Sequence, residues 1–250
     1  MSDYIYLSPH LDDAVFSCGA ILWDQIHQQH KTVEIWTIFA GDEPQGELSL
    51  FASQIHARWN TGANAARVRR SEDQLACERL GVNSRHLHYA DCIYRHDPQN
   101  GRYLIENNED LFQGIHPSEL PLIDEISQFL KQNLPESCKL ILPLGVGGHM
   151  DHLITRQAAE KINRPIYYYA DFPYAGAHLE EISTRIPPQS KAYHFPINNV
   201  SLARWQYAVE AYTSQLSSFW PSLSQMYKAI EKYAQSPLGN CLWKSPTDIL

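Results

Sequence analysis

The sequence lacks several features that mark whole classes of protein. Among its 250 residues there is no run of about 18 apolar residues, the length that a membrane-spanning helix needs. The first residues have no basic segment followed by an apolar one, so no signal peptide is predicted. Basic residues are outnumbered, with 20 Lys and Arg against 28 Asp and Glu and a net charge of −8. This balance disfavours binding to nucleic acid and docking on anionic membranes, because nucleic acid and anionic lipid both attract basic surfaces. Without a long apolar run, no membrane insertion is expected.

Cysteine is also sparse, and its spacing does not fit a disulfide framework. The five cysteines are an odd number, and no two are spaced as C-x-x-C. This usage is typical of reduced thiols, so a cytoplasmic protein is predicted. Histidine, by contrast, occurs 12 times. Neutral imidazole is a common metal ligand, so these residues are the first candidates for a functional site.

The order of the apolar segments predicts an α/β fold, a Rossmann-like, mostly parallel sheet with helices on both faces. Runs rich in β-branched and aromatic residues predict strands at residues 4–7, 33–39, 86–89, 139–143, 165–169 and 192–195. Helical spacing of apolar residues predicts a first helix that ends at about residue 30. It predicts further helices over residues 67–80, 119–134, 152–162, 202–217 and 223–235.

The rest of the chain shows no repeat and no linker. Residues 41–64 and 91–117 are weakly patterned and are predicted to be long loops, the first with one helical turn at most. We therefore expect a single domain over residues 1–250. Its core would cover about residues 1–170, and residues 171–250 would form a C-terminal extension that completes the pocket.

Two clusters of His and Asp follow predicted strands. Residues 9–13 read Pro-His-Leu-Asp-Asp after the first strand, and residues 149–152 read His-Met-Asp-His after the fourth. Ligands of open α/β sheets bind beyond the carboxyl ends of the strands, so both clusters should lie at one edge. A catalytic zinc needs three protein ligands and an open position. The clusters offer His10, Asp12, Asp13, His149, Asp151 and His152, although a helix cap at Asp13 and a plain loop at 149–152 would each be ordinary alternatives.

With these motifs the sequence resembles the PIG-L/LmbE-like family of zinc-dependent N-acetylglucosaminyl deacetylases. That family carries P-H-x-D-D after its first strand and H-x-D-H about two thirds of the way along. Arg69 and Glu72 fit the family's R-x-x-E helix, and the resemblance covers roughly the first 170 residues. It implies a metal-dependent amidohydrolase that removes the N-acetyl group from an N-acetylated amino sugar.

The resemblance also implies a role for each matching residue. The zinc ligands would be His10, Asp13 and His152. Asp12 would be the general base that activates water, and a protonated His149 would stabilise the oxyanion. Asp151 would orient one of the two histidines that flank it.

Three further positions are candidates for contact with substrate. Arg69 is either a substrate clamp or a surface partner of Glu72, and we favour the clamp. Asp171 and Tyr174 follow an aromatic strand, where they could bind a sugar or simply belong to a packed turn. Some family members have a Tyr two residues before H-x-D-H, where this chain has Gly147. Either His149 and the metal suffice, or another side chain reaches in.

Several questions stay open at the level of sequence. Two His and one carboxylate accept Zn²⁺, Fe²⁺, Co²⁺ or Ni²⁺. The expected partner is a small-molecule N-acetyl-sugar conjugate. The sequence leaves open whether the protein forms a homo-oligomer. The alternative functions are a metallohydrolase of another amide or ester, and a metal-binding relative without catalysis. Dinucleotide binding is disfavoured, because G-x-G-x-x-G is missing after the first strand.

Overall fold

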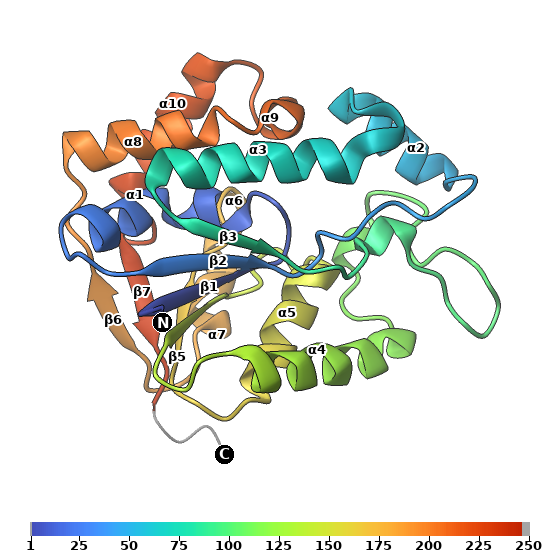
Figure 1. Cartoon of the computed structure of the whole chain (residues 1–250), viewed down its shortest axis with the longest axis horizontal. Helices are drawn as coiled ribbons and strands as arrows, with labels where there is room; N and C mark the ends of the chain where they lie inside the picture. Colours follow the sequence, from blue (N-terminus) through green and yellow to red (C-terminus); the bar gives the residue numbers. More distant parts are fainter. Residues whose placement is uncertain (1, 247–250) are drawn as a thin grey trace.

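A seven-stranded sheet forms the centre of the computed structural model, which describes residues 2–246 (Figure 1). The sheet order is β3-β2-β1-β4-β5-β7-β6. Its strands are β1 (Tyr4–Ser8), β2 (Val33–Thr37), β3 (Asn83–His86), β4 (Lys139–Pro143), β5 (Ile166–Tyr169), β6 (Lys191–His194) and β7 (Cys241–Lys244). The first five of these pair in parallel, and β7 runs antiparallel to both β5 and β6. The predicted α/β class with a mostly parallel sheet is confirmed.

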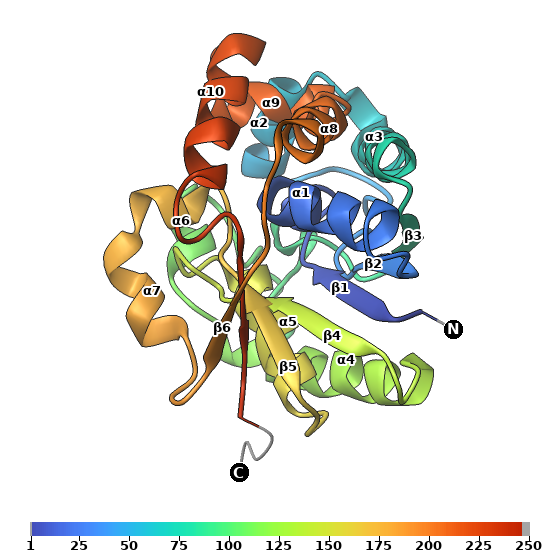
Figure 2. The ribbon, with the colours of Figure 1, turned by 90° about the vertical axis from the view of Figure 1, so that its left-hand side faces the viewer.

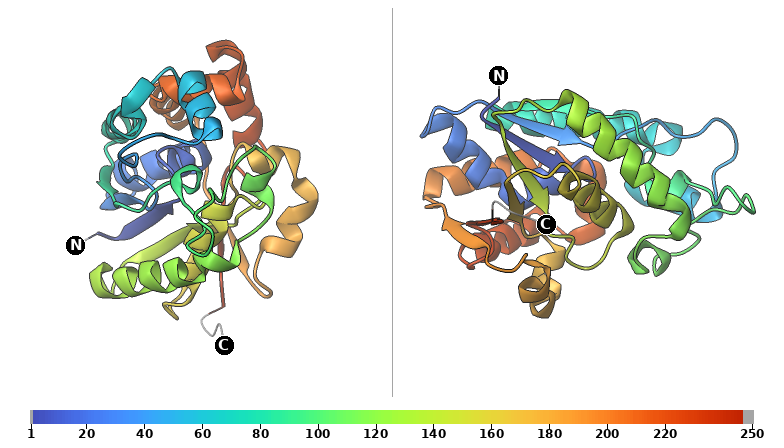
Figure 3. Two further views of the ribbon diagram at one scale, coloured as in Figure 1. Left: turned by 90° about the vertical axis from the view of Figure 1, so that its right-hand side faces the viewer. Right: turned by 90° about the horizontal axis from the view of Figure 1, so that it is seen from below.

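Helices cover both faces of this sheet. On one face lie α1 (Asp13–His27), α3 (Ala65–Leu80) and α8 (Asn199–Val209), and on the other lie α4 (Leu120–Asn133) and α5 (Met150–Glu160) (Figure 2). The same two layers are seen from the opposite side and from below in Figure 3. The remaining helices are α2 (Leu50–Trp59), α6 (Tyr174–Ala177), α7 (Leu179–Arg185), α9 (Thr213–Phe219) and α10 (Leu223–Ala234). Among the described residues, none of the helices is both long and apolar enough to cross a membrane.

The central strands are buried on both sides. All five residues of β1 are buried, and in β4 only Lys139 is exposed. A strand that is covered by helices on both faces has no solvent side, so it reads as a continuous apolar run rather than as an alternating one. This is why β1 and β4 are the strands that the sequence marks most clearly.

Helices α1 and α8 cross at very close range. Trp205 of α8 is fully buried, and its Nε1 donates a hydrogen bond to the Val15 carbonyl at 2.8 Å. A Cβ atom on Gly19 would lie only 2.1 Å from Cδ1 of the Trp205 ring. The missing side chain at Gly19 therefore makes room for the indole. Through this contact α8, in the last third of the chain, packs against α1.

The structure differs from the sequence-based expectation in several elements, and the helix expected over residues 202–217 is divided into α8 and α9. β3 covers Asn83–His86 rather than 86–89, because an edge strand with only β2 beside it can be polar. Within the expected loop 41–64, α2 is a ten-residue helix that Ser49 caps by accepting a hydrogen bond from the Ala52 N–H. β7 was not predicted at all, because a four-residue strand carries too little periodicity to be recognised.

Candidate active site

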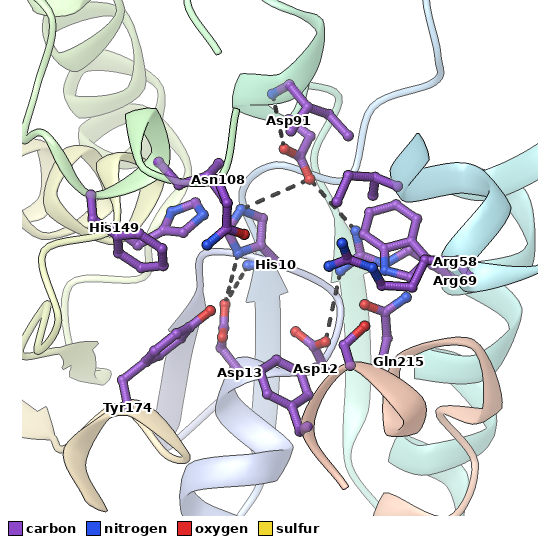
Figure 4. Close-up of a pocket in the computed structure, with 17 residues that line it drawn as sticks. His10, Asp12, Asp13, Arg58, Arg69, Asp91, Asn108, His149, Tyr174 and Gln215 are labelled. Carbon is purple, nitrogen blue, oxygen red and sulfur yellow. Dashed lines mark hydrogen bonds and ion pairs between the residues drawn. The ribbon is translucent and has the colours of Figure 1, made fainter. Parts of the chain in front are cut away.

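The two His/Asp clusters meet at the topological switch point of the sheet, where the order in which successive strands are added changes direction. β1 is followed by β2 on one side, and β4 is followed by β5 on the other, although β1 and β4 are neighbours. This arrangement opens a crevice beyond the carboxyl ends of the two strands. Residues 9–13 leave β1 there, and residues 149–152 lie there at the start of α5. The structure thus brings both clusters into one buried site (Figure 4).

The segment after β1 turns tightly and directs two carboxylates inward. Ser8 Oγ donates to the His10 carbonyl at 2.6 Å and accepts from the Ala14 N–H at 3.0 Å. Asp12 precedes the first residue of α1, but its side chain makes no capping hydrogen bond. Asp13 Oδ2 accepts the His10 N–H at 2.8 Å. Helix capping therefore does not account for either aspartate.

Asp13 Oδ2 faces one nitrogen from each of two histidines. It lies 3.2 Å from His10 Nδ1 and 3.3 Å from His152 Nε2. Ligand atoms that are each about 2.0–2.1 Å from a tetrahedral ion lie about 3.3 Å from one another, so these separations match the edges of such a site. His152 Nε2 is buried and has no hydrogen-bond partner in the described chain. These donors fit a divalent metal ion.

The opposite nitrogen of each of these histidines is held by a second carboxylate. His10 Nε2 lies 3.0 Å from Asp151 Oδ2, and His152 Nδ1 lies 2.7 Å from Asp171 Oδ1. An imidazole that donates one N–H to a carboxylate presents the other nitrogen as a lone pair. Both lone pairs then point toward Asp13, which is the arrangement that a metal ligand requires.

Asp151 and Asp171 lie behind the site rather than in its cavity. Asp151 is fully buried and also accepts hydrogen bonds from Arg95 at 2.6 Å and from the Cys92 N–H at 3.0 Å. It orients His10 and not one of the histidines that flank it in sequence. Asp171 also accepts the Val146 N–H at 3.0 Å and does not line the cavity. Its place favours a role behind His152 over the substrate contact expected from the sequence.

The charges around the two histidines favour a positive charge between them. Burial opposes protonation of His10 and His152, but the adjacent carboxylates outweigh it, so the pKa of His10 is raised well above its ordinary value and that of His152 to about 9. Burial also opposes ionisation of Asp13, yet His152 and His10 hold the pKa of its carboxyl well below the usual range. The local potential is therefore strongly negative, as a cation site requires.

Asp12 and His149 stand beside this cluster and line the cavity. Burial, together with the charge of Asp13, raises the pKa of Asp12 to about 7. Burial lowers the pKa of His149 well below its ordinary value, and His10 and His152 lower it further. His149 caps α5, where its Nδ1 accepts the Asp151 N–H at 3.3 Å. Because Nδ1 is an acceptor there, the neutral ring carries its proton on Nε2.

A cavity of about 270 Å³ opens in front of these groups. His149 and Tyr174 lie on one side of it, and Arg58 and Arg69 lie on the other (Figure 4). Its lining also includes apolar side chains, namely Ile55, Trp59, Ile93, Leu111, Phe112 and Phe219. A mixed wall of this kind suits a ligand that has both apolar faces and hydroxyl groups, as a sugar ring has.

Arg69 and Glu72 are neither a surface pair nor joint members of the cavity. Arg69 is buried in the cavity wall, with its guanidinium 4.5 Å above the Trp59 ring. Glu72 instead accepts hydrogen bonds from Thr213 Oγ1 at 2.6 Å and from the Ser214 N–H at 2.8 Å. It thereby fixes the start of α9, whose later residues line the cavity.

Tyr174 takes up the space that Gly147 leaves. A Cβ atom on Gly147 would lie 3.4 Å from Tyr174 Cβ, and Gly147 has a φ of +82°. The Tyr174 ring lines the cavity, and its hydroxyl end points toward Asp13 (Figure 4). Burial and the charge of Asp13 raise the pKa of this phenol, so it stays protonated and can donate a hydrogen bond.

Sequence reasoning missed Asp91 and Arg95. Asp91 Oδ2 lies 3.5 Å from Arg69 Nη1 and 3.9 Å from His10 Nε2. Both missed residues follow β3, which is parallel to β2, so their position beyond a strand's carboxyl end was the available signal. That signal was lost because the third strand was expected three residues too late.

The chain is similar to a known family and to several known deacetylases. The profile of the PIG-L family, described as GlcNAc-PI de-N-acetylase, matches residues 5–163. A 2'-N-acetylparomamine deacetylase of Niallia circulans is 28% identical over 197 residues, which span 71% of this chain and 69% of that protein. Its counterpart in Streptomyces fradiae is 27% identical over 184 residues, 69% of this chain and 57% of that protein.

Among solved structures, a teicoplanin deacetylase in its zinc-inhibited form superposes with a TM-score of 0.82. It is 28% identical, and the match covers 96% of this chain and 97% of that one. An N,N'-diacetylchitobiose deacetylase of Pyrococcus horikoshii, at 15% identity and a TM-score of 0.53, shares the fold. Because the family profile matches more than half of its 250 residues, the chain belongs to the PIG-L family.

Proposed function

We propose that this protein is a metal-dependent amidohydrolase that removes the acetyl group from an N-acetylated amino sugar of the N-acetylglucosamine type. The observation that carries the proposal is the cluster of His10, Asp13 and His152, in which both histidines are oriented by further buried carboxylates. Membership of the PIG-L family supports it. So does the similarity to proteins named as deacetylases of acetylated paromamine and of teicoplanin.

His10, Asp13 and His152 would hold the ion. We favour Zn²⁺, and the same donors accept Fe²⁺, Co²⁺ or Ni²⁺. When bound, a divalent ion would polarise the amide carbonyl and make a water molecule more acidic. The nitrogens of His10, His149 and His152 lie within 4.8 Å of one another. We assign Asp13 rather than His149 as the third ligand, because Asp13 Oδ2 faces both of the other donors directly.

Asp12 is positioned to move the proton. It lines the cavity next to Asp13, it is buried, and no hydrogen bond engages its carboxylate elsewhere in the described structure. It would accept a proton from water as the C–O bond forms at the carbonyl carbon. It would then return that proton to the amide nitrogen as the C–N bond breaks, which releases acetate and the free amino sugar.

His149 and Tyr174 would stabilise the negative charge that develops on the carbonyl oxygen. The neutral His149 ring has its Nε2–H available, and Tyr174 has its hydroxyl. We therefore favour a neutral His149 over the protonated form that was expected from the sequence. Two donors that are held rigidly in a water-poor pocket stabilise an oxyanion far better than water does.

The remaining assignments concern substrate binding, the carboxylates behind the proposed metal ligands, the domain and the cellular compartment. Arg69 would bind the sugar, while Asp151 and Asp171 would orient His10 and His152. Tyr174, Gln215 and Phe219 belong to residues 171–250 and line the cavity, which supports a C-terminal extension that completes the pocket of one domain. The five free, buried cysteines fit a reducing compartment, so we propose a small-molecule enzyme of the cytoplasm.

The test is acetate release from a panel of N-acetylglucosamine conjugates. The protein would be assayed as metal-loaded, as chelator-treated and as reloaded samples. We expect release from the loaded protein, loss after chelation and recovery on reloading with Zn²⁺. One bound metal per chain without release from any conjugate would refute the proposal and favour another acyl bond or a purely binding role.

A further inference from the structure

We propose that Gln215 selects the substrate by accepting a hydrogen bond from one hydroxyl group of the sugar, and that Glu72 and Ser214 fix its amide group for this role. Gln215 belongs to α9 and lines the cavity, on the same side as Arg58 and Arg69 (Figure 4). The inference rests on the proposed deacetylase function, because it concerns the part of the acetylated sugar that is not cleaved.

Gln215 is buried, yet half of its amide group has no partner. The residue is 3% exposed. Its Nε2 donates a hydrogen bond to Ser214 Oγ at 2.8 Å, whereas no group within residues 2–246 donates to its Oε1. Buried polar atoms in native proteins nearly always have a hydrogen-bond partner. A buried acceptor without one at a cavity wall indicates that a ligand supplies the donor.

The orientation of this amide follows from the groups behind it. Glu72 Oε2 accepts a hydrogen bond from Ser214 Oγ at 2.6 Å. A carboxylate only accepts, so the single hydroxyl proton of Ser214 points to Glu72, and the Ser214 oxygen is left to accept from Gln215. Only the NH₂ end of the Gln215 amide can donate there. The reversed amide would leave Ser214 Oγ close to a carboxylate oxygen with no proton between them, so the carbonyl end is the one that is free for a ligand.

Helix α3 holds the segment that carries Gln215 at three consecutive residues. Tyr212 donates its hydroxyl proton to Asp73 Oδ1 at 2.7 Å. Thr213 Oγ1 and the Ser214 N–H both donate to Glu72 Oε1, at 2.6 Å and 2.8 Å. An acceptor that is already fixed loses little further freedom when a ligand binds, so its hydrogen bond contributes more to affinity and selectivity.

The donor on the substrate is a hydroxyl group rather than the acetamido N–H. In the proposed function the acetamido carbonyl lies near His149 and Tyr174, and these side chains are across the cavity from Gln215 (Figure 4). The sugar hydroxyls are the donors that remain on the part of the substrate away from the cleaved bond. A hydroxyl can donate to an amide carbonyl, whereas a hydrogen or an ether oxygen in its place cannot.

The experiment removes the sugar hydroxyls one at a time. The substrates are the methyl glycoside of N-acetylglucosamine and its 3-deoxy, 4-deoxy and 6-deoxy analogues, and acetate release by metal-loaded protein is measured. We expect kcat/KM to fall about 10- to 100-fold for one deoxy analogue, because the analogue leaves the buried carbonyl of Gln215 without a donor. The ratio of kcat/KM for the parent sugar to that for this analogue is the selectivity ratio.

Variants then assign the selectivity to Gln215. Gln215→Leu and Gln215→Met have no acceptor, so each should bring the selectivity ratio to about one, mainly by slowing the parent sugar. Gln206→Leu is the matched control and should leave the ratio unchanged. Gln206 is a half-buried glutamine of α8 whose Nε2 donates to the Tyr227 carbonyl, and it does not line the cavity.

Ser214→Ala tests the positioning role. Without Ser214 Oγ the Gln215 amide can rotate, so the selectivity ratio should fall in part. In the Gln215→Leu background the same substitution should have no further effect on the ratio, because its influence passes through Gln215. A general loss of structure would lower kcat/KM for both sugars equally and would leave the ratio unchanged.

The outcomes separate the two proposals. Selectivity ratios that are the same in Gln215→Leu, Gln215→Met and the parent protein would overturn the role of Gln215 and leave the deacetylase function intact. Equal kcat/KM for all four sugars would do the same. Absence of release from every conjugate would overturn the deacetylase function itself. Calorimetric titration with the corresponding free amino sugars repeats the comparison without turnover, and equal Zn²⁺ content would show that the variants keep the metal site.

Discussion

Asp171 Oδ1 lies 2.7 Å from His152 Nδ1, and both side chains are 1% exposed. On the other side of the same ring, Nε2 lies 3.3 Å from Asp13 Oδ2. His152 is therefore held between two buried carboxylates. Asp171 fixes the orientation of the ring, and Asp13 lies opposite the nitrogen that carries the lone pair. Asp151 and Asp13 do the same for His10. This repeated arrangement would hold the proposed metal site in place before any ion binds.

Asp171→Asn should weaken metal binding. The amide keeps the shape of the side chain but loses the negative charge that fixes the proton on His152 Nδ1. We expect the affinity for Zn²⁺ to fall about 10- to 100-fold, measured by competition with a chromogenic chelator. Asp124→Asn is the control, because the Asp124 side chain is 71% exposed and does not line the cavity. An affinity equal to that of the parent would show that Asp171 does not orient the ligand.

Asp12→Asn should separate metal binding from catalysis. Asp12 lines the cavity, and among the described residues it is not one of the carboxylates paired with His10 or His152, so the variant should still bind one metal per chain. Removal of a positioned acid–base group should lower kcat about 10²- to 10⁴-fold. Metal content by elemental analysis and acetate release would be measured on the same sample. Residual activity near the parental level would exclude Asp12 as the base.

Tyr174→Phe should lower kcat with little change in KM. The phenyl ring would still fill the space beside Gly147, so only the hydroxyl donor is lost. Loss of one oxyanion donor typically costs about 10²–10³-fold in kcat, and His149 would keep the remaining share. Tyr207→Phe serves as control, because Tyr207 is 45% exposed on α8. If kcat is retained and KM rises instead, Tyr174 binds the sugar and does not stabilise the oxyanion.

Gly19→Ala should destabilise the fold without touching the site directly. The new methyl group would collide with the buried Trp205 ring, so α1 and α8 would have to move apart. Overpacking of this kind costs about 1–3 kcal/mol of unfolding free energy. Thermal denaturation would measure it. Gly176→Ala provides the comparison, because a Cβ there meets nothing within 4 Å. Equal stability of the two variants would contradict the close α1–α8 contact.

The sequence by itself determined the fold class and the position of the two His/Asp clusters. β1 and β4 are buried on both faces, so they appear as unbroken apolar runs in the sequence. The residues that directly follow each run must then lie at the carboxyl end of that strand. His10, Asp12, Asp13, His149 and His152 could therefore be assigned to one edge of the sheet from sequence alone. Local patterns were sufficient because each cluster lies immediately beyond a strand or at the start of a helix.

Only the tertiary structure decided which carboxylate orients which histidine, and which distant residues reach the site. Asp151 lies next to His152 in sequence, yet it binds His10, because the first turn of α5 points its carboxylate across to the segment after β1. Asp171 and Tyr174 reach the site from beyond β5, and Arg58 reaches it from a helix that sequence patterns did not reveal. Such contacts join residues far apart in the chain, and they depend on helix orientation and loop course, which no local periodicity encodes.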